Sequence, residues 1–355
     1  MNMLPVLSII ILNYQGKAVL GRCVNSLLRS SYQNYEVVFV DNASTDGSYE
    51  DALALLSDIK YKIIIRNEQN YGFTKGFNIG MKTANGKYLL LLNNDAFVSE
   101  NALEELVNFM DENPSVGMAE GRIVNKAAGT YTTSNPNVVN FFGQFVEAGT
   151  HTLDHAEFET VKYILCPVGV WPIVRREAYE LTGGYDEDFV HVEEIRDWAM
   201  RIWISGYKVG YIFNAMTEHL GRLTNTANNY GKAIALSTYY NSTKNKILLF
   251  LKDFQDRTIL LYYFPFILIV LTDLLSSSFY HGKSAFGAKF RAYVWIIKNI
   301  SNINEKRYRI KKIRTTGDRT ILSNAVRLSP TNMKSMITMR KDYEFDTFKW
   351  LNNRY

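Results

Sequence analysis

The first hundred residues contain four short runs of apolar residues, separated by segments with helical periodicity. The runs are VLSIIIL, YEVVFV, KIIIR and YLLLL, which begin at Val6, Tyr35, Lys62 and Tyr88. Runs of strand length that are apolar at nearly every position are typical of parallel strands buried on both faces of a sheet. The intervening segments place apolar residues three and four apart, as amphipathic helices do. The sequence therefore predicts an α/β fold in which strands and helices alternate.

Two helix starts are predicted from local signals. Ser48 is followed by Asp51 with the spacing of a capping box, and Ser99 stands directly before a segment with helical periodicity. Serine is a preferred N-cap because its hydroxyl accepts a hydrogen bond from a free backbone N–H. We therefore expect Ser48 and Ser99 to cap the second and fourth helices.

Polar residues follow each of the four apolar runs at once. In chain order they are Asn13 and Tyr14, Asp41 and Asn42, Asn67, and finally Asn93, Asn94 and Asp95. Ligands of open α/β sheets bind outside the carboxyl ends of the strands. One polar strand end is an ordinary turn, whereas four at the same edge of a sheet predict a binding site.

The fourth polar segment offers two oxygen-bearing side chains one residue apart. Alternate residues of an extended chain point the same way, so Asn93 and Asp95 can bind Mg²⁺ or Mn²⁺ together with phosphate oxygens. A turn stabilised by Asn and Asp side chains is the simpler explanation of this triplet taken alone. Asp41 can likewise accept hydrogen bonds from a ribose or a base edge, or it can belong to a turn.

A second acidic cluster lies in the segment GGYDEDFVHVEEIRDW. Glu193, Glu194 and Asp197 stand at the start of a helix predicted over about 196–205, where the helix dipole stabilises carboxylates. One of them can also serve as a general base that takes the proton of a hydroxyl nucleophile. His219, at the predicted end of a later strand, can bind a metal through a neutral imidazole. A purely structural role is the simpler explanation of a single histidine.

These motifs together resemble the inverting glycosyltransferases of family two, most closely the rhamnosyltransferase-like members. The matching stretches are LSIIILNY, VDNASTDGS, NYGFTKGFNIG, LLLLNNDAF, GGYDEDF, RIWISGYKV and YYNSTKNKILLFLK, in the expected order between residues 7 and 252. The resemblance implies the GT-A fold, a Rossmann-like mixed sheet that binds nucleotide-diphospho-sugars. It also implies a catalytic domain over residues 1–222 and a mainly helical, basic extension over residues 223–355.

The resemblance further implies a metal-dependent transfer of sugar from a UDP- or dTDP-sugar to a hydroxyl of a glycan or lipid-linked acceptor. The metal, Mn²⁺ or Mg²⁺, would be bound by Asp95, by Asn93 in the weaker first position of the motif, and by His219. Asp41 would read the base, and Lys75 and Asn78 would lie near the diphosphate. The residues expected around the nucleotide are Asn13, Tyr14, Asp41, Asn42, Lys75, Asn78 and Asn94.

The acidic cluster departs from the family pattern. Family members usually carry Glu-Asp-x-Asp there, and the Asp after the Glu serves as the base, whereas this chain has Glu194, Ile195, Arg196 and Asp197. Isoleucine cannot accept a proton, so Glu194 is the nearest replacement, with Asp197 and Glu193 as alternatives. The same departure allows a chain without catalysis, which would be a sugar-nucleotide-binding or scaffold subunit of a glycan assembly complex.

The segment from Thr258 to Tyr280 is apolar except for Asp273, and Pro265 is expected to kink it. It is long enough to span a bilayer. We nevertheless expect a helix pair lying in the membrane interface, because the basic residues between 283 and 319 favour anionic lipid. A buried helical core or an interface with a second copy of the chain are the alternatives. No nucleic-acid-binding module accompanies the basic run, so no nucleic-acid partner is expected.

Cysteine content and the first residues bear on location. Two cysteines, Cys23 and Cys166, cannot form a disulfide framework, which favours a reducing compartment. The start MNMLPVLSIIILNY has no basic region before its apolar run and no small-residue cleavage site after it, so a strand is expected there. We therefore expect a peripheral or monotopic protein on the cytoplasmic face of the plasma membrane.

Overall fold

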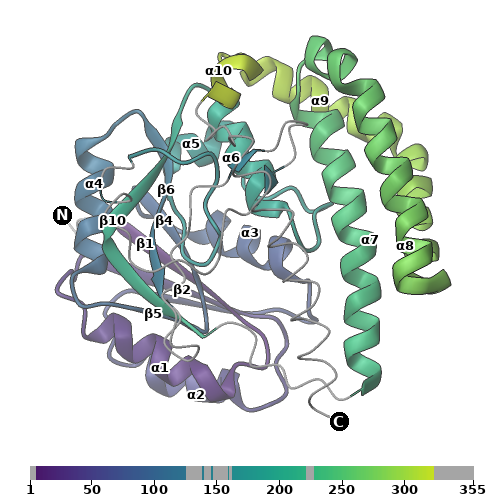
Figure 1. Ribbon diagram of the computed structural model, residues 1–355. Coiled ribbons are helices and arrows are strands. Elements are labelled where there is room, and N and C mark those ends of the chain that lie inside the picture. Colours follow the sequence, from purple (N-terminus) through teal and green to yellow (C-terminus); the bar gives the residue numbers. More distant parts are fainter. Residues whose placement is uncertain are drawn as a thin grey trace.

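The computed structural model describes residues 5–124, 138–139, 145–146, 159, 162–220 and 228–323. An eight-stranded sheet with the order β3-β2-β1-β4-β9-β6-β10-β5 forms its centre (Figure 1). The strands are β1 (Leu7–Asn13), β2 (Tyr35–Asp41), β3 (Lys62–Arg66), β4 (Tyr88–Asn93), β5 (Ala96–Val98), β6 (Val116–Val124), β9 (Ile173–Arg175) and β10 (Lys208–His219). A separate two-stranded pair joins β7 (Val138–Val139) to β8 (Phe145–Val146). The predicted α/β fold is confirmed.

The sheet is mixed, and the four apolar runs form its parallel half. Strands β3, β2, β1 and β4 are parallel neighbours. Strand β9 lies antiparallel between β4 and β6, β10 runs parallel to β6, and β5 pairs antiparallel with β10. The parallel half is the part whose strands are apolar on both faces, because helices cover both sides of it.

Helices cover the two faces of the sheet, as the pleat of β1 shows. Leu7, Ile9 and Ile11 pack on the side of α1, α2 and α4, whereas Ile10 packs against Phe77 on the side of α3. The helices of the first 220 residues are α1 (Lys17–Leu28), α2 (Ser48–Leu55), α3 (Phe73–Thr83), α4 (Ala102–Glu112), α5 (Arg176–Thr182) and α6 (Glu194–Ile204). Alternate strand residues therefore belong to two separate cores.

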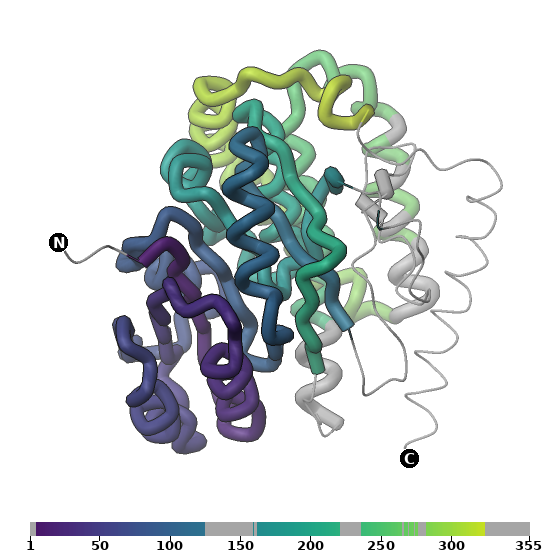
Figure 2. Tube along the Cα trace, turned by 90° about the vertical axis from the view of Figure 1, so that its left-hand side faces the viewer, coloured from purple at the N-terminus to yellow at the C-terminus, as the bar shows by residue number. Residues whose placement is uncertain are grey.

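A helical region follows the sheet and forms an outer layer on the side of α3 and α6 (Figure 1). Its helices are α7 (Asn228–Asp253), α8 (Asp256–Lys298), α9 (Ile300–Ile313) and α10 (Asp318–Ser323). Helix α7 contacts α6, α8 and α9, and α9 also contacts α5 and α6. Figure 2 shows α9 and α10, in yellow, crossing the top of the molecule. The helical extension is thus packed onto the elements that follow β9.

Helix α8 bends at a different residue from the one expected. The helix continues through Pro265, and its non-helical residue is Gly282, with φ 79°. A left-handed glycine interrupts a helix at little steric cost, so the kink predicted at Pro265 was wrong. Among the residues that the structure describes, no helix is both long enough and apolar enough to cross a membrane.

Both predicted serine caps were also wrong. Ser48 is the first residue of α2 rather than its cap, and its hydroxyl donates to Asp46 at 2.6 Å. Ser99 lies three residues before α4, and its hydroxyl donates to the carbonyl of Met216 at 3.0 Å. In both cases a different residue precedes the helix, Gly47 before α2 and Asn101 before α4, and the serine hydroxyl donates to a group outside the helix.

Gly80 of α3 lies against the sheet so closely that a side chain has no room. A Cβ there would lie 2.4 Å from Cγ2 of Ile10 and 3.1 Å from Cγ2 of Val40. We expect Gly80→Ala to lower the free energy of unfolding by about 1–3 kcal/mol, because overpacking outweighs the helix propensity gained. Equilibrium denaturation in urea measures the change.

Gly21→Ala is the matched control, since Gly21 lies in α1 and a Cβ added there would lie 4.0 Å from its nearest non-local atom, Cδ1 of Leu55. Alanine fits there without overlap, so this variant should raise the free energy of unfolding by about 0.5–1 kcal/mol. Equal effects of the two substitutions would contradict the close packing of α3 on β1.

Candidate functional site

Three strand ends carry the predicted polar residues to one edge of the sheet. Asn13 of β1 lies opposite Asp41 of β2, and Leu12 lies opposite Asn93 of β4. The strands are parallel, so their carboxyl ends share this edge, where ligands of open α/β sheets bind. The structure therefore brings together the residues that the sequence placed after separate strands.

Asn13 is the centre of this edge. Its Nδ2 lies 2.9 Å from Oδ1 of Asp41, 3.1 Å from Oγ of Ser44 and 2.9 Å from Oγ of Ser48. Its Oδ1 accepts a hydrogen bond from Nδ2 of Asn94 at 2.9 Å. The Asn13 side chain is fully buried, so it fixes the loops after β2 and β4 relative to each other.

The loops after β2 and β3 are joined by further bonds. Asp41 has no exposed surface, and its Oδ2 accepts the backbone N–H of Ser44 at 3.0 Å. Asn42 donates to the carbonyl of Gly72 at 3.1 Å and accepts from Nδ2 of Asn67 at 2.8 Å. Because the carboxylate of Asp41 is fully buried, a base can contact it only if the loops around it move.

Two side chains of this edge remain partly open. Tyr14 directly follows β1 and is 49% exposed, so its ring is accessible for stacking on a flat ligand. Lys75, in the first turn of α3, has its Nζ 4.1 Å from the centre of the Tyr71 ring. A cation at the start of a helix adds to the positive end of the helix dipole, which favours an anionic ligand.

Asp95 and His219 form the candidate metal site. Nε2 of His219 lies 3.2 Å from Oδ1 of Asp95, and each side chain is about a quarter exposed. The pairing of β5 with β10 produces this contact, because it sets His219 opposite Ala96. A carboxylate oxygen and an imidazole nitrogen suit Mn²⁺ or Mg²⁺. The described residues contain no cluster of three or more His, Cys, Asp or Glu that could hold a metal alone, so ligand or water oxygens would complete the shell.

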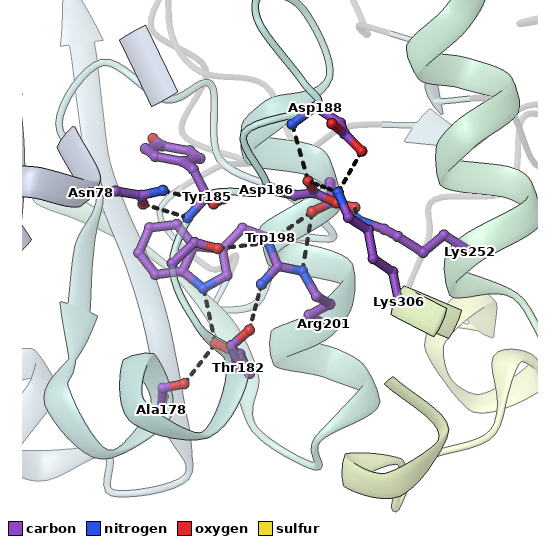
Figure 3. A network of polar contacts seen from close by, with 12 residues as sticks. Asn78, Ala178, Thr182, Tyr185, Asp186, Asp188, Trp198, Arg201, Lys252 and Lys306 are labelled. Carbon is purple, nitrogen blue, oxygen red and sulfur yellow. Dashed lines mark hydrogen bonds and ion pairs between the residues drawn. The ribbon is translucent and has the colours of Figure 1, made fainter. Parts of the chain in front are cut away.

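Asn78 contacts the loop between α5 and α6. Its Nδ2 donates to the carbonyl of Tyr185 at 2.9 Å and to Oε1 of Glu187 at 3.1 Å, and its Oδ1 accepts the N–H of Tyr185 at 3.0 Å (Figure 3). These bonds attach α3 to this loop. The amide of Asn78 is therefore engaged by the protein itself.

Glu120 was not found from the sequence. This fully buried carboxylate of β6 accepts the backbone N–H groups of residues 168–171 at 2.7–3.1 Å. Within that segment, Val170 accepts the N–H of Asn93 at 3.0 Å, and a Cβ on Gly169 would lie 3.2 Å from Ile195. Glu120 thus holds the segment that separates the end of β4 from α6. The only available signal was a charged residue inside an apolar strand.

Asp197 belongs to a buried ion network rather than to an open site. Its side chain has no exposed surface, and its Oδ2 lies 2.7 Å from Nη2 and 3.1 Å from Nε of Arg201. Its Oδ1 pairs with Lys252 of α7. Figure 3 labels Arg201 and Lys252, the two basic partners, beside Asp186. An acceptor hydroxyl cannot reach Asp197 in this arrangement.

Glu194, the first residue of α6, is the available carboxylate. Its Oε2 is buried and makes no hydrogen bond to any described residue. Burial raises the pKa of Glu194 to about 7. Glu193 is instead paired with Arg196 at 2.9 Å. Ile195, where the sequence resemblance expects the base, is 7% exposed and packs in the core. A carboxyl group with a pKa near neutrality is suited to general-base work.

Comparison with known families identifies the family of the chain. A model described as "Glycosyl transferase family 2" matches residues 8–166, and one described as "Glycosyl transferase family group 2" matches residues 88–298. The second match covers more than half of the chain. The chain belongs to glycosyl transferase family group 2. Both matches include strand ends of the candidate site, and the second extends into α7 and α8.

Curated relatives align with part of the chain. An uncharacterised glycosyltransferase of Haemophilus influenzae is 35% identical over 113 residues, which are 32% of this chain and 45% of that protein. Glycosyltransferase GlyG of Streptococcus pneumoniae is 30% identical over 110 residues, 31% of this chain and 36% of that protein. The chain thus spans less than half the length of these two relatives.

Solved structures show the same fold. GalNAc-T7 with UDP, GalNAc and Mn²⁺ matches with a TM-score of 0.56 and 17% identity, over 73% of this chain and 49% of that one. S. aureus TarS 1-349 matches with a TM-score of 0.52 and 15% identity, over 89% of this chain and 90% of that one. The predicted GT-A fold with a helical C-terminal region is confirmed.

Proposed function

We propose that the chain is a metal-dependent inverting glycosyltransferase that moves a sugar from a nucleotide-diphosphate donor to a hydroxyl acceptor. The observation that carries the proposal is the contact between Asp95 and His219 at the strand ends, beside the Asn13 network. It puts two metal-ligand side chains next to a sheet edge of the kind that binds nucleotides in open α/β sheets. Family membership supports the reaction class.

Different residues of this edge would bind different parts of the donor. Asn13, Asp41, Asn42 and Asn94 shape the loops that would hold the nucleoside, and Tyr14 would stack on its base. Asp95 and His219, with Asn93 beside them on the strand, would hold Mn²⁺ or Mg²⁺. When bound, the cation would neutralise the charge that develops on the leaving diphosphate. Lys75, at the start of α3, would add positive charge on the diphosphate.

Glu194 would act as the general base. It would take the proton of the acceptor hydroxyl, whose oxygen then attacks the anomeric carbon from the face opposite the diphosphate. The bond from that carbon to the diphosphate oxygen breaks, the nucleoside diphosphate leaves, and the configuration inverts. The burial that raises the pKa of Glu194 supports this role. The ion pairs of the two alternative bases, Asp197 with Arg201 and Glu193 with Arg196, favour Glu194 over them.

The substrate range is part of the proposal. The sequence resemblance supports a UDP- or dTDP-sugar donor, a hexosyl or rhamnosyl group, and a glycan or lipid-linked acceptor in polysaccharide biosynthesis. The structurally similar mannosyltransferase PcManGT from Pyrobaculum calidifontis is described in complex with GDP-Man and Mn²⁺, with a TM-score of 0.50 and 14% identity over 88% of this chain and 86% of that one. GDP therefore belongs beside UDP and dTDP in a binding test.

Nucleotide binding tests the donor site. We expect one of UDP, dTDP or GDP to bind more tightly with Mn²⁺ than without it, and Asp95→Ala or His219→Ala to weaken the Mn²⁺-dependent binding by about 10-fold or more, since each removes a metal ligand. Isothermal titration calorimetry measures both. Asp58→Ala, an exposed carboxylate after α2, is the control and should leave binding unchanged.

Two outcomes would contradict parts of this assignment. Metal-dependent binding that survives Asp95→Ala would show that the metal site is elsewhere. Binding of a nucleotide without hydrolysis or transfer of any nucleotide sugar would favour a sugar-nucleotide-binding subunit of a glycan assembly complex, the alternative that Ile195 motivates.

The raised pKa of Glu194 predicts the pH dependence of the rate. A base works in its ionised form, so the turnover rate should rise as pH passes about 7 and level off above it. Glu194→Gln should lower kcat by about 10²–10⁴-fold and abolish this rise. Rates of donor hydrolysis from pH 5.5 to about 9 measure the profile. Glu177→Gln, exposed on α5, should retain the rise, and a rise retained by Glu194→Gln would exclude Glu194 as the base.

We also propose that α8 attaches the protein to the cytoplasmic face of the plasma membrane. Phe264 is 79% exposed, and it shares one face of the helix with other exposed apolar side chains. They are Leu260, Leu261, Leu268, Leu271 and Leu275. Helix α8 lies at the outer edge of the molecule (Figure 1), and the exposed basic residue Lys312 of α9 would complement anionic lipid.

Vesicle binding tests this attachment. Phe264→Glu combined with Leu268→Glu should reduce binding to phosphatidylserine vesicles by about 10-fold or more, because each buried side chain contributes about 1.5–3 kcal/mol. Co-sedimentation measures the bound fraction. Leu53→Glu, at an exposed apolar position of α2, is the control. If the protein forms dimers through α8 in solution and does not bind vesicles, the partner of α8 is a second copy of the chain and not the membrane.

A further inference from the structure

The acidic loop, residues 185–193, is held from outside by the helical extension. Nζ of Lys252 lies 2.7 Å from Oδ2 of Asp186, and Nζ of Lys306 lies 2.5 Å from Asp186 and from Asp188 (Figure 3). Burial by itself would raise the pKa of Asp186, but the two ammonium groups outweigh it and hold that pKa well below its usual range. Helices α7 and α9 therefore anchor the first half of the loop.

The second half of the loop has a strained backbone. Val192 has φ 68° and Glu193 has φ 69°. Left-handed backbone is disfavoured for residues with a side chain and is a true outlier for a β-branched one. Such conformations persist only where the surroundings hold them, and they cluster at functional sites. These two residues directly precede Glu194.

Asn245 of α7 supplies the bonds that hold this turn. It is fully buried, and its Nδ2 donates to the carbonyl of His191 at 2.8 Å and to the carbonyl of Val192 at 2.6 Å. One amide group thus binds two successive carbonyls and fixes their relative direction. Without it, both carbonyls would lose a partner and the left-handed turn would lose the contact that opposes its relaxation.

We propose that Asn245 is a positioning residue of the glycosyl-transfer reaction, which holds the left-handed turn at Val192 and Glu193 so that Glu194 stays in reach of the acceptor hydroxyl. The inference rests on the proposed function, in which Glu194 is the base. It extends that function by assigning a catalytic consequence to a residue of the helical extension. A displacement of about 1 Å at a catalytic group can cost about 100-fold in rate.

The test compares Asn245→Ala with Asn241→Ala in the full chain. Asn241 is one turn earlier on α7, is also buried, and donates to Ser237 within the helix. Asn245→Ala should lower kcat for hydrolysis of UDP-, dTDP- or GDP-sugars by about 10–100-fold, with KM and nucleotide affinity within about 2-fold of the wild type, because the donor edge is untouched. It should also speed amide hydrogen exchange in residues 190–195. Asn241→Ala should change none of these quantities by more than about 2-fold.

The substitution Val192→Gly tests whether the fall in kcat of Asn245→Ala comes from a misplaced Glu194 or only from lost packing. Glycine adopts positive φ freely, so adding Val192→Gly to Asn245→Ala should restore several-fold of the lost kcat by lowering the cost of the turn. Loss of packing alone would not be restored, since glycine fills no space. Should Asn245→Ala fail to fold, Asn245→Ser, which keeps one donor, should give an intermediate kcat and intermediate exchange.

The outcomes distinguish this inference from the function on which it rests. Faster exchange in residues 190–195 with kcat no lower than in Asn241→Ala would overturn the positioning role. So would an increase in KM and nucleotide Kd as large as the fall in kcat. A wild-type chain that neither binds nucleotide nor hydrolyses donor would instead refute the proposed function. Unchanged hydrogen exchange in Asn245→Ala would separately refute the claim that Asn245 holds the turn at Val192 and Glu193.

Discussion

The second half of the molecule depends on the ion pairs that the buried ammonium of Lys252 makes. It pairs with Asp186 of the acidic loop and with Asp197 of α6, while its own backbone belongs to α7. Charges without exposed surface are tolerated only when they are paired, and removing one partner leaves the other uncompensated. The helical extension is therefore not an appendage of the sheet. It supplies counter-charges without which the acidic loop and α6 would not share one buried environment.

Two carboxylates of α6 show how environment separates residues of similar chemistry. Asp197 is paired with Arg201 and Lys252, whereas Glu194, one turn away, has no hydrogen-bond partner among the described residues at its buried oxygen, and its pKa rises to about 7. Different environments for neighbouring acids are how one site obtains both a structural anion and a proton acceptor. The isoleucine at position 195 fits this division, because it packs against Gly169 in the core and leaves the polar roles to the residues on either side.

The sequence was informative where local pattern decides the structure. The four apolar runs predicted the parallel strands, and their polar ends predicted the edge at which Asn13, Asp41 and Asn94 meet. The sequence was uninformative where a residue far away in the chain determines the contacts of a side chain. Ser99 stands where a cap is expected, but its hydroxyl donates to the carbonyl of Met216, and α4 begins only at Ala102. Glu120 carries no motif, because its role exists only once residues 168–171 fold over it.

The residues that hold the acidic loop come late in the chain, which affects the order in which parts of the protein are made. The residues of the proposed donor edge all precede α7, and the last of them is His219, which β10 brings to Asp95. The groups that hold the acidic loop, Asn245, Lys252 and Lys306, are made afterwards. On the proposed function, a growing chain would therefore contain every residue of the donor edge before it contains those that orient the base. This order would keep partly made chains from hydrolysing activated sugar.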